Sequence, residues 1–308
     1  MPGLIDLYEA HKKDRDKFEI LAFHDGTVKG FAELDNKTER PRNRFWGRHD
    51  LPFPILLDST GQTIKEWGVH AFPTTLLIDP KGKLVGRADE KELEEKLPPL
   101  PMSVRVARAL DRNLPAFLVK DRKLDYAMQL MSRLSNVPIR LDVQSLKAAG
   151  VSPDDTVPLE MTTSITLRSA LNLLLEAHHL TYAQDDKGLV IKVRESGTRP
   201  EDLSERQRLT SKRLEKALDE KVSFDFENKP LQDVAVFFRS HIPFETVVLS
   251  PRDRKAGRLD PKMLVTGSAK DIPLREALTK LLGPLGVGYT IRDEVIVLTA
   301  RPKAAASR

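Results

Sequence analysis

Residues 67–86 read WGVHAFPTTLLIDPKGKLVG, and this stretch decides the fold of the first part of the chain. The runs TTLLI and KLVG each predict a short strand. The four residues between them, DPKG at 79–82, predict a tight turn, because proline fixes φ and glycine accepts a positive φ. Pro73 stands at the entrance of the first strand. The stretch therefore predicts a β-hairpin that is entered through a proline.

Further short elements flank this hairpin. The apolar runs FEILAF (residues 18–23) and FPILLD (residues 53–58) predict two more strands. Residues 4–11 have apolar side chains at helical spacing, and DEKELEEKL at 89–97 predicts an exposed helix. The first 97 residues thus predict an α/β segment.

This segment resembles the thioredoxin-like TlpA/ResA-type thiol–disulfide oxidoreductases, which overlap the redoxins. The match rests on LPFPILLDSTGQTIKEWGVHAFPTTLLIDPKGKLVG at 51–86 and on MPGLIDLYEAHKKDRDKFEILAF at 1–23. The resemblance implies a cis peptide bond between Phe72 and Pro73. It also implies that Phe72, Pro73 and Thr74 form a loop whose backbone pairs with an extended peptide or partner chain.

Cysteine is absent from all 308 residues. In the family a W-C-x-x-C motif precedes the MPxLxxLY sequence, whose proline is Pro2 here, so the expected cysteines would precede Met1. The strand before that motif would be absent too, which predicts an incomplete thioredoxin-like sheet with a gap between FEILAF and TTLLI. Either the start is assigned too late or the gene is a true truncation, and we favour the late start.

Composition excludes several classes of protein. The formal net charge of +5 is a small difference between 50 basic and 45 acidic residues. The sequence contains no block of like charges, so nucleic-acid binding is not predicted. No apolar run approaches the ~20 residues that a membrane span needs, and no export signal is recognised. Without cysteine there is no thiolate nucleophile and no zinc–cysteine site. His178 and His179 are adjacent on a predicted helix and point apart, so we predict no metal site and no cofactor.

The remainder of the chain contains an internal repeat. ITLRSALNLLL begins at Ile165 and IPLREALTKLL begins at Ile272, and seven of the eleven positions are identical. The same offset relates Phe117 to Phe224 and Tyr182 to Tyr289, with a slip of one residue between the two helices of each copy. Two copies of one unit are therefore expected.

Each copy predicts the order strand, helix, strand, strand, helix, strand, strand. Each predicted helix has an apolar stripe, which favours a small α+β sandwich with helices on one face of a sheet. The stripes of the first copy are Leu124, Ala127, Met128, Met131 and then Leu167, Ala170, Leu171, Leu174, Leu175. Those of the second copy are Leu231, Val234, Ala235, Phe238 and then Leu274, Ala277, Leu278, Leu281, Leu282.

The second copy is similar to the short domain at the N-terminus of secretins and TonB-dependent transducers. Lys229-Pro230-Leu231 and Leu274-Arg275-Glu276-Ala277-Leu278 fall on that pattern, and the first copy fits less closely. The resemblance implies protein-interaction modules of the bacterial cell envelope, with no catalytic residues to carry over.

The predicted fold class is α/β plus α+β: an incomplete thioredoxin-like sheet followed by two small βαββαβ-type sandwich domains. The predicted boundaries are a thioredoxin-like domain at 1–97, a linker with a short helix at 98–114, repeat 1 at 115–194, a charged linker at 195–220, repeat 2 at 221–301 and a disordered tail at 302–308. The charged linker is expected to be an exposed helix or a mobile segment.

Two functions follow from these patterns. The first is a non-catalytic protein-interaction protein of the cell envelope whose partners are other proteins or extended peptides. The alternative is a fragment of an extracytoplasmic thiol–disulfide oxidoreductase whose C-x-x-C lies upstream of Met1. The location is the periplasm or cell envelope by resemblance, and the cytoplasm if Met1 is the true start.

Overall fold

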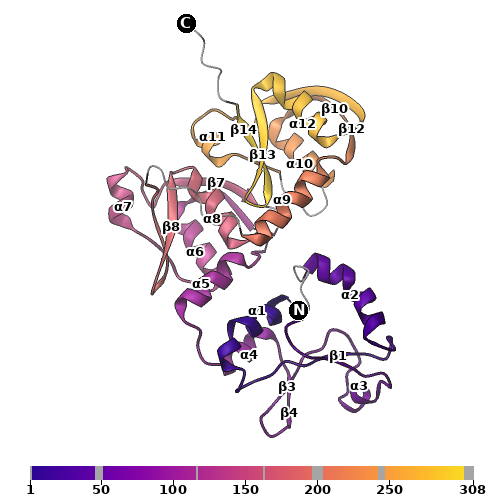
Figure 1. Cartoon of the computed structure of the whole chain (residues 1–308). Helices are drawn as coiled ribbons and strands as arrows, with labels where there is room; N and C mark the ends of the chain where they lie inside the picture. Colours follow the sequence, from indigo (N-terminus) through magenta and orange to yellow (C-terminus); the bar gives the residue numbers. More distant parts are fainter. Residues whose placement is uncertain are drawn as a thin grey trace. The chain divides into compact units, whose positions relative to one another are not determined.

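The computed structural model describes residues 2–45, 51–115, 117–161, 164–195, 204–241 and 247–301 (Figure 1). The chain divides into two compact units, Met1–Val104 and Arg105–Arg308.

The first unit contains two separate two-stranded sheets. Strand β1 (Ala22–His24) pairs in parallel with β2 (Ile55–Leu57), and β3 (Leu76–Ile78) pairs antiparallel with β4 (Leu84–Arg87). The remaining elements are α1 (Pro2–Ala10), a 3-10 turn (Lys12–Asp14), α2 (Phe31–Phe45), α3 (Gln62–Glu66) and α4 (Glu90–Lys96). No ladder joins β1 to β3 within the described residues, so each of these strands has one edge without a strand partner.

The β3–β4 hairpin forms as the opening stretch predicts. The N–H of Gly82 donates to the carbonyl of Asp79 at 2.9 Å, and Gly82 takes φ 79°, which glycine adopts without a steric penalty. The Asp79 carboxylate accepts from the N–H groups of Lys81 at 2.9 Å and Lys83 at 2.8 Å. After the hairpin, Asp89 and Glu92 form a reciprocal capping box that starts α4.

The first unit buries few apolar side chains and exposes many. Tyr8 packs edge-on against Phe53 with ring centroids 5.3 Å apart, at the centre of its small core. That core also contains Leu7, Val28 and Leu34. The exposed large apolar side chains of this unit are Leu21, Phe23, Phe31, Leu56, Phe72, Ile78, Leu84 and Val85. Much of its apolar surface is therefore open to a partner.

The second unit contains two copies of one arrangement. We call residues 117–193 the first repeat and residues 221–300 the second repeat. The first comprises β5 (Phe117–Lys123), α6 (Leu124–Ser135), β6 (Ile139–Leu141), α7 (Val143–Ala148), β7 (Thr156–Met161), α8 (Leu167–Glu176), β8 (Leu180–Asp185) and β9 (Gly188–Val193). The second comprises β10 (Lys221–Pro230), α10 (Leu231–His241), β11 (Val247–Leu249), α11 (Pro251–Lys255), β12 (Leu264–Pro273), α12 (Leu274–Leu282), a 3-10 turn (Gly283–Leu285), β13 (Val287–Arg292) and β14 (Val295–Ala300).

Strand pairing is the same in both repeats. The first and third strands form an antiparallel ribbon, β5–β7 or β10–β12. The other three form a sheet of order β6–β9–β8 or β11–β14–β13, whose central strand is parallel to one neighbour and antiparallel to the other. The structure adds one short helix, α7 or α11, that the predicted element order lacks.

Each of the two predicted linker segments contains a helix, as expected for 98–114 and as one of two alternatives for 195–220, and the structure adds that both helices pack against a core. Segment 98–114 contains α5 (Met102–Asp111), which buries Val106, Ala109 and Leu110. Segment 195–220 contains α9 (Glu205–Ala217), and Leu214 and Leu218 belong to the core of the second repeat. Each of these helices has charged side chains on one face and apolar side chains on the other, and the apolar face is buried. A helix therefore precedes each repeat and packs with it.

An ion pair of the same kind links each preceding helix to its repeat. Arg168 Nε lies 3.2 Å from Asp111, and Arg275 Nε lies 2.8 Å from Asp219. Arg168 and Arg275 are related by the repeat offset. The repeated unit thus also includes the helix that precedes each repeat, α5 before 117–193 and α9 before 221–300.

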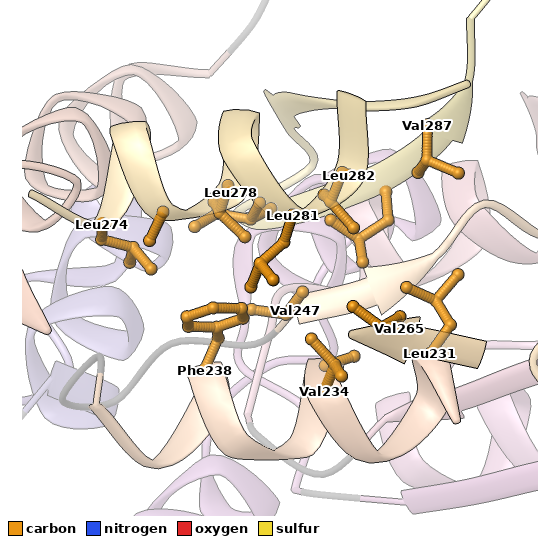
Figure 2. Packing of buried hydrophobic residues seen from close by; sticks show 14 of the residues in the cluster. Leu231, Val234, Phe238, Val247, Val265, Leu274, Leu278, Leu281, Leu282 and Val287 are labelled. Carbon is orange, nitrogen blue, oxygen red and sulfur yellow. The ribbon is translucent and has the colours of Figure 1, made fainter. Parts of the chain in front are cut away.

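The core of the second repeat lies between α10 and α12 (Figure 2). Phe238 of α10 and Leu281 of α12 point toward each other across it, and Val247 of β11 lies beside them. All the apolar stripe residues predicted for both repeats are buried, which confirms those stripes.

Candidate functional site

The loop at Phe72–Thr74 borders an open depression in the first unit. The Phe72–Pro73 peptide bond is cis, as predicted. Pro73 and Thr74 line a depression of about 680 Å³ together with Leu4 of α1, the end of β4 and the start of α4. The predicted loop therefore contributes two residues to an open surface depression.

Phe72 is not among the residues that line the depression, but it directly precedes Pro73 in the chain and exposes an apolar ring. Its side chain is 59% exposed, although the phenyl ring is among the side chains that gain most from burial. The loop behind it is held in place: Thr74 Oγ1 donates to the Ala71 carbonyl at 2.6 Å, and the Ala88 N–H donates to the Thr75 carbonyl at 3.1 Å. A fixed loop that exposes an aromatic ring is suited to binding.

Acidic side chains dominate the rim of the depression. The lining residues include four carboxylates, on Asp89, Glu90, Glu92 and Glu95, and two cations, on Arg87 and Lys91. Lys91 and Glu95 form an exposed pair at 3.9 Å, which contributes little to stability. The excess of carboxylates favours a ligand that carries positive charge.

Unpaired strand edges and exposed apolar side chains occur together in the first unit. Phe23 on β1, Leu56 on β2 and Ile78 on β3 are all exposed. A strand edge presents N–H and C=O groups in the spacing that another extended chain can match. This unit therefore offers both backbone and apolar contacts to an extended polypeptide.

The chemistry of the site is limited by its residues. The chain contains no cysteine, so its own side chains supply neither thiol of a dithiol exchange. Among the residues that the structure describes, no group of three His, Cys, Asp or Glu is placed to hold a metal ion. In the same part of the chain, no helix has the length and apolarity that crossing a bilayer requires.

A second polar cluster lies where the two repeats meet. Asp293 and Glu294 form the β13–β14 turn and have φ values of 50° and 62°. Non-glycine residues rarely adopt this conformation, and such positions often mark functional contacts. Glu294 is buried and accepts from Thr166 Oγ1 at 2.6 Å and from the Thr166 N–H at 2.9 Å. The turn of the second repeat thus docks on Thr166, the N-cap residue of α8.

Further bonds surround this contact. Asn172 Nδ2 donates to Asp293 at 2.7 Å, and Arg292 bonds to Glu176 of the first repeat. Burial raises the pKa of the Asp293 carboxyl above its ordinary value, and the Asn172 and Arg292 bonds oppose this effect. This cluster was not predicted from the sequence, although the lack of glycine in the Asp293–Glu294 turn is a signal for it.

His178 belongs to the same junction. Its Nε2 lies 3.0 Å from the Thr156 carbonyl and therefore donates, which leaves Nδ1 to accept from Lys255 Nζ at 2.6 Å. Asp155 lies 3.5 Å from Nδ1. Burial lowers the pKa of His178, and the Lys255 ammonium acts in the same direction. The buried imidazole is thus a neutral bridge between the repeats.

Stability at this junction is expected to fall in acid. Because folding lowers the pKa of His178, the unfolded chain binds the proton more readily, and the free energy of unfolding decreases as the pH falls below about 6.5. His178→Gln keeps a donor and an acceptor without a titrating group. We expect urea unfolding of this variant to change less between neutral and acidic pH than that of the unaltered chain. The exposed His70→Gln is the control, and equal pH dependence in both variants would contradict the assignment.

Comparison with protein families identifies residues 24–100, within the first unit, as thioredoxin-like. The family model described as Redoxin matches residues 24–100, which include the Phe72–Thr74 loop. Searches of curated proteins and of solved structures found no match to the chain. The TlpA/ResA type and the secretin/TonB resemblance of the repeats stay predictions.

Proposed function

We propose that the chain is a non-catalytic, thioredoxin-like protein that binds extended segments of other proteins, in the bacterial cell envelope. The observation that supports this proposal is the exposed Phe72, which precedes two residues that line a depression, Pro73 and Thr74, in a redoxin-like segment. The absence of cysteine supports binding without redox chemistry. The envelope location rests on the resemblances stated for the sequence, and cell fractionation tests it.

The bound segment would contact three features of the first unit. Its apolar side chain would cover Phe72, its positive charges would face the rim of α4, and its backbone would extend along the loop. Apolar burial contributes roughly 25 cal/mol per Å², and the exposed carboxylates mainly set specificity and association rate. Binding should therefore weaken moderately with salt.

Replacing Phe72 by alanine is expected to weaken binding of an unfolded polypeptide by about five- to thirtyfold, since an aromatic contact of this kind is typically worth ~1–2 kcal/mol. Carboxymethylated α-lactalbumin, which stays unfolded, is a suitable fluorescent probe, and anisotropy reports its dissociation constant. Phe31→Ala is the matched control, because Phe31 is 58% exposed and lies on α2. Equal effects of the two variants, or no binding by the unaltered chain, would refute the proposal.

The open edges of β1 and β3 favour a second candidate. In an oxidoreductase of this class, a strand between them would lead into the helix that carries C-x-x-C. The 308 residues would then be part of a longer, exported enzyme. Peptide mass spectrometry of the native protein tests this: peptides upstream of Met1 that contain W-C-x-x-C would support it. The chain of 308 residues should fail to reduce insulin under either candidate.

A further inference from the structure

The junction between the repeats uses different faces of the two copies. The second repeat contributes its β13–β14 turn and α11, and the first contributes the start of α8 and strand β7. We call the β13–β14 turn together with α11 the turn face of a repeat. We call the start of α8 together with β7 the helix face, and we use both names for the equivalent elements of the other repeat. Because the faces differ, the turn face of the first repeat and the helix face of the second are not used in this contact.

The unused turn face is exposed and carries both charge and an apolar side chain. In the first repeat, Lys187 stands at the position of Glu294, and α7 stands at the position of α11. Lys187 is exposed, and Val143 at the start of α7 is 57% exposed. Pro251, which starts α11 in the second repeat, is buried instead. This face of the first repeat therefore resembles a contact surface without its partner.

The unused helix face has complementary features. In the second repeat, Glu276 occupies the position of Ser169 in the first turn of α12, and Leu264 occupies the position of Thr156 at the start of the third strand. Glu276 is exposed, and Leu264 is 56% exposed. Large apolar side chains are exposed at only four described positions of the second unit, Tyr126, Val143, Val236 and Leu264, and two of these lie on the unused faces.

We propose that the turn face of the first repeat of one chain docks on the helix face of the second repeat of another copy of this chain. The contact seen once within the chain would thus recur between chains. Lys187 would pair with Glu276, and Val143 would lie over the surface that contains Leu264. Such an interface is heterologous, so it builds a ring or an open filament according to whether the rotation closes.

The inter-chain contact should be weaker than the contact within the chain. Pro273 replaces Thr166 and has no N–H to donate, so the two bonds that Glu294 accepts have no equivalent. A single exposed ion pair contributes little, and the apolar contact must supply most of the affinity. We therefore expect dissociation constants of about 10–1,000 µM, which fit a reversible assembly.

Charge reversal tests this pairing. Sedimentation velocity of the whole chain at rising concentration and about 50 mM salt should show a rising mass. Lys187→Glu and Glu276→Lys should each weaken association by about tenfold, and a mixture of the two variants should regain it. Lys81→Glu, an exposed turn residue of the first unit, is the control for charge. A chain that stays monomeric throughout, or association that neither reversal changes, would overturn the proposal.

The apolar contact is tested separately. Val143→Ser and Leu264→Ser should each weaken association by about tenfold, whereas Val236→Ser, which alters an equally exposed side chain outside both faces, should not. Far-UV circular dichroism checks that each variant is folded. Equal behaviour of all three variants would show that association arises elsewhere, such as on the first unit, and would also overturn the proposal.

Discussion

Phe238→Ala is expected to lower the free energy of unfolding of the second repeat by about 3–5 kcal/mol, because it removes a fully buried phenyl ring and leaves a cavity. The ring has three aromatic neighbours, Phe224, Phe226 and Phe237, with centroids 6.0, 6.2 and 5.5 Å away. Loss of these contacts adds to the loss of apolar burial.

Urea unfolding followed by far-UV circular dichroism measures this change. Val236→Ala, on the same helix and half exposed, should shift stability by less than about 0.5 kcal/mol. If Phe238→Ala does not fold, Phe238→Leu should fold and lose a smaller amount, about 1–1.5 kcal/mol. Equal stability of Phe238→Leu and the unaltered chain would contradict the packing shown in Figure 2.

The core of each repeat was predictable from sequence because its signal is local. Leu274, Leu278 and Leu281 recur at helical spacing, and a helix that exposes such a stripe has no stable place in water. All three are buried against α10 and the ribbon. The hairpin at 76–87 was predictable for the same reason, since its turn residues are adjacent in the chain.

The junction was not predictable, because its partners are far apart in sequence. Glu294 and Thr166 are 128 positions apart, and no local sequence pattern around either residue indicates that the two are in contact. The packing of α9 was missed because charged residues make up much of its segment, and α5 was predicted only as a short helix without a packing partner. In the candidate site, the loop residues followed from a resemblance, whereas the lining from α1 and α4 required the fold.

Glu294→Ala is expected to destabilise the second unit by about 1–3 kcal/mol. The variant leaves the buried Thr166 N–H without its acceptor, whereas the Thr166 hydroxyl keeps Ser169 Oγ at 3.0 Å, and an unsatisfied buried donor costs about 1–3 kcal/mol. It also weakens the contact between the turn and α8, although the bonds to Asn172 and Glu176 remain, so the two repeats should lose part of their mutual stabilisation. We expect a single unfolding transition in the unaltered second unit and a broader or divided transition in the variant.

The repeat supplies a matched control for this change. Asp186→Ala alters the equivalent turn of the first repeat, next to Lys187, where the side chains are exposed, and should change stability by less than about 0.5 kcal/mol. Urea unfolding at low protein concentration excludes any effect of association. If the two alanine variants were equally stable, the β13–β14 turn would not be a docking element, because a buried carboxylate with two donors cannot be removed without cost.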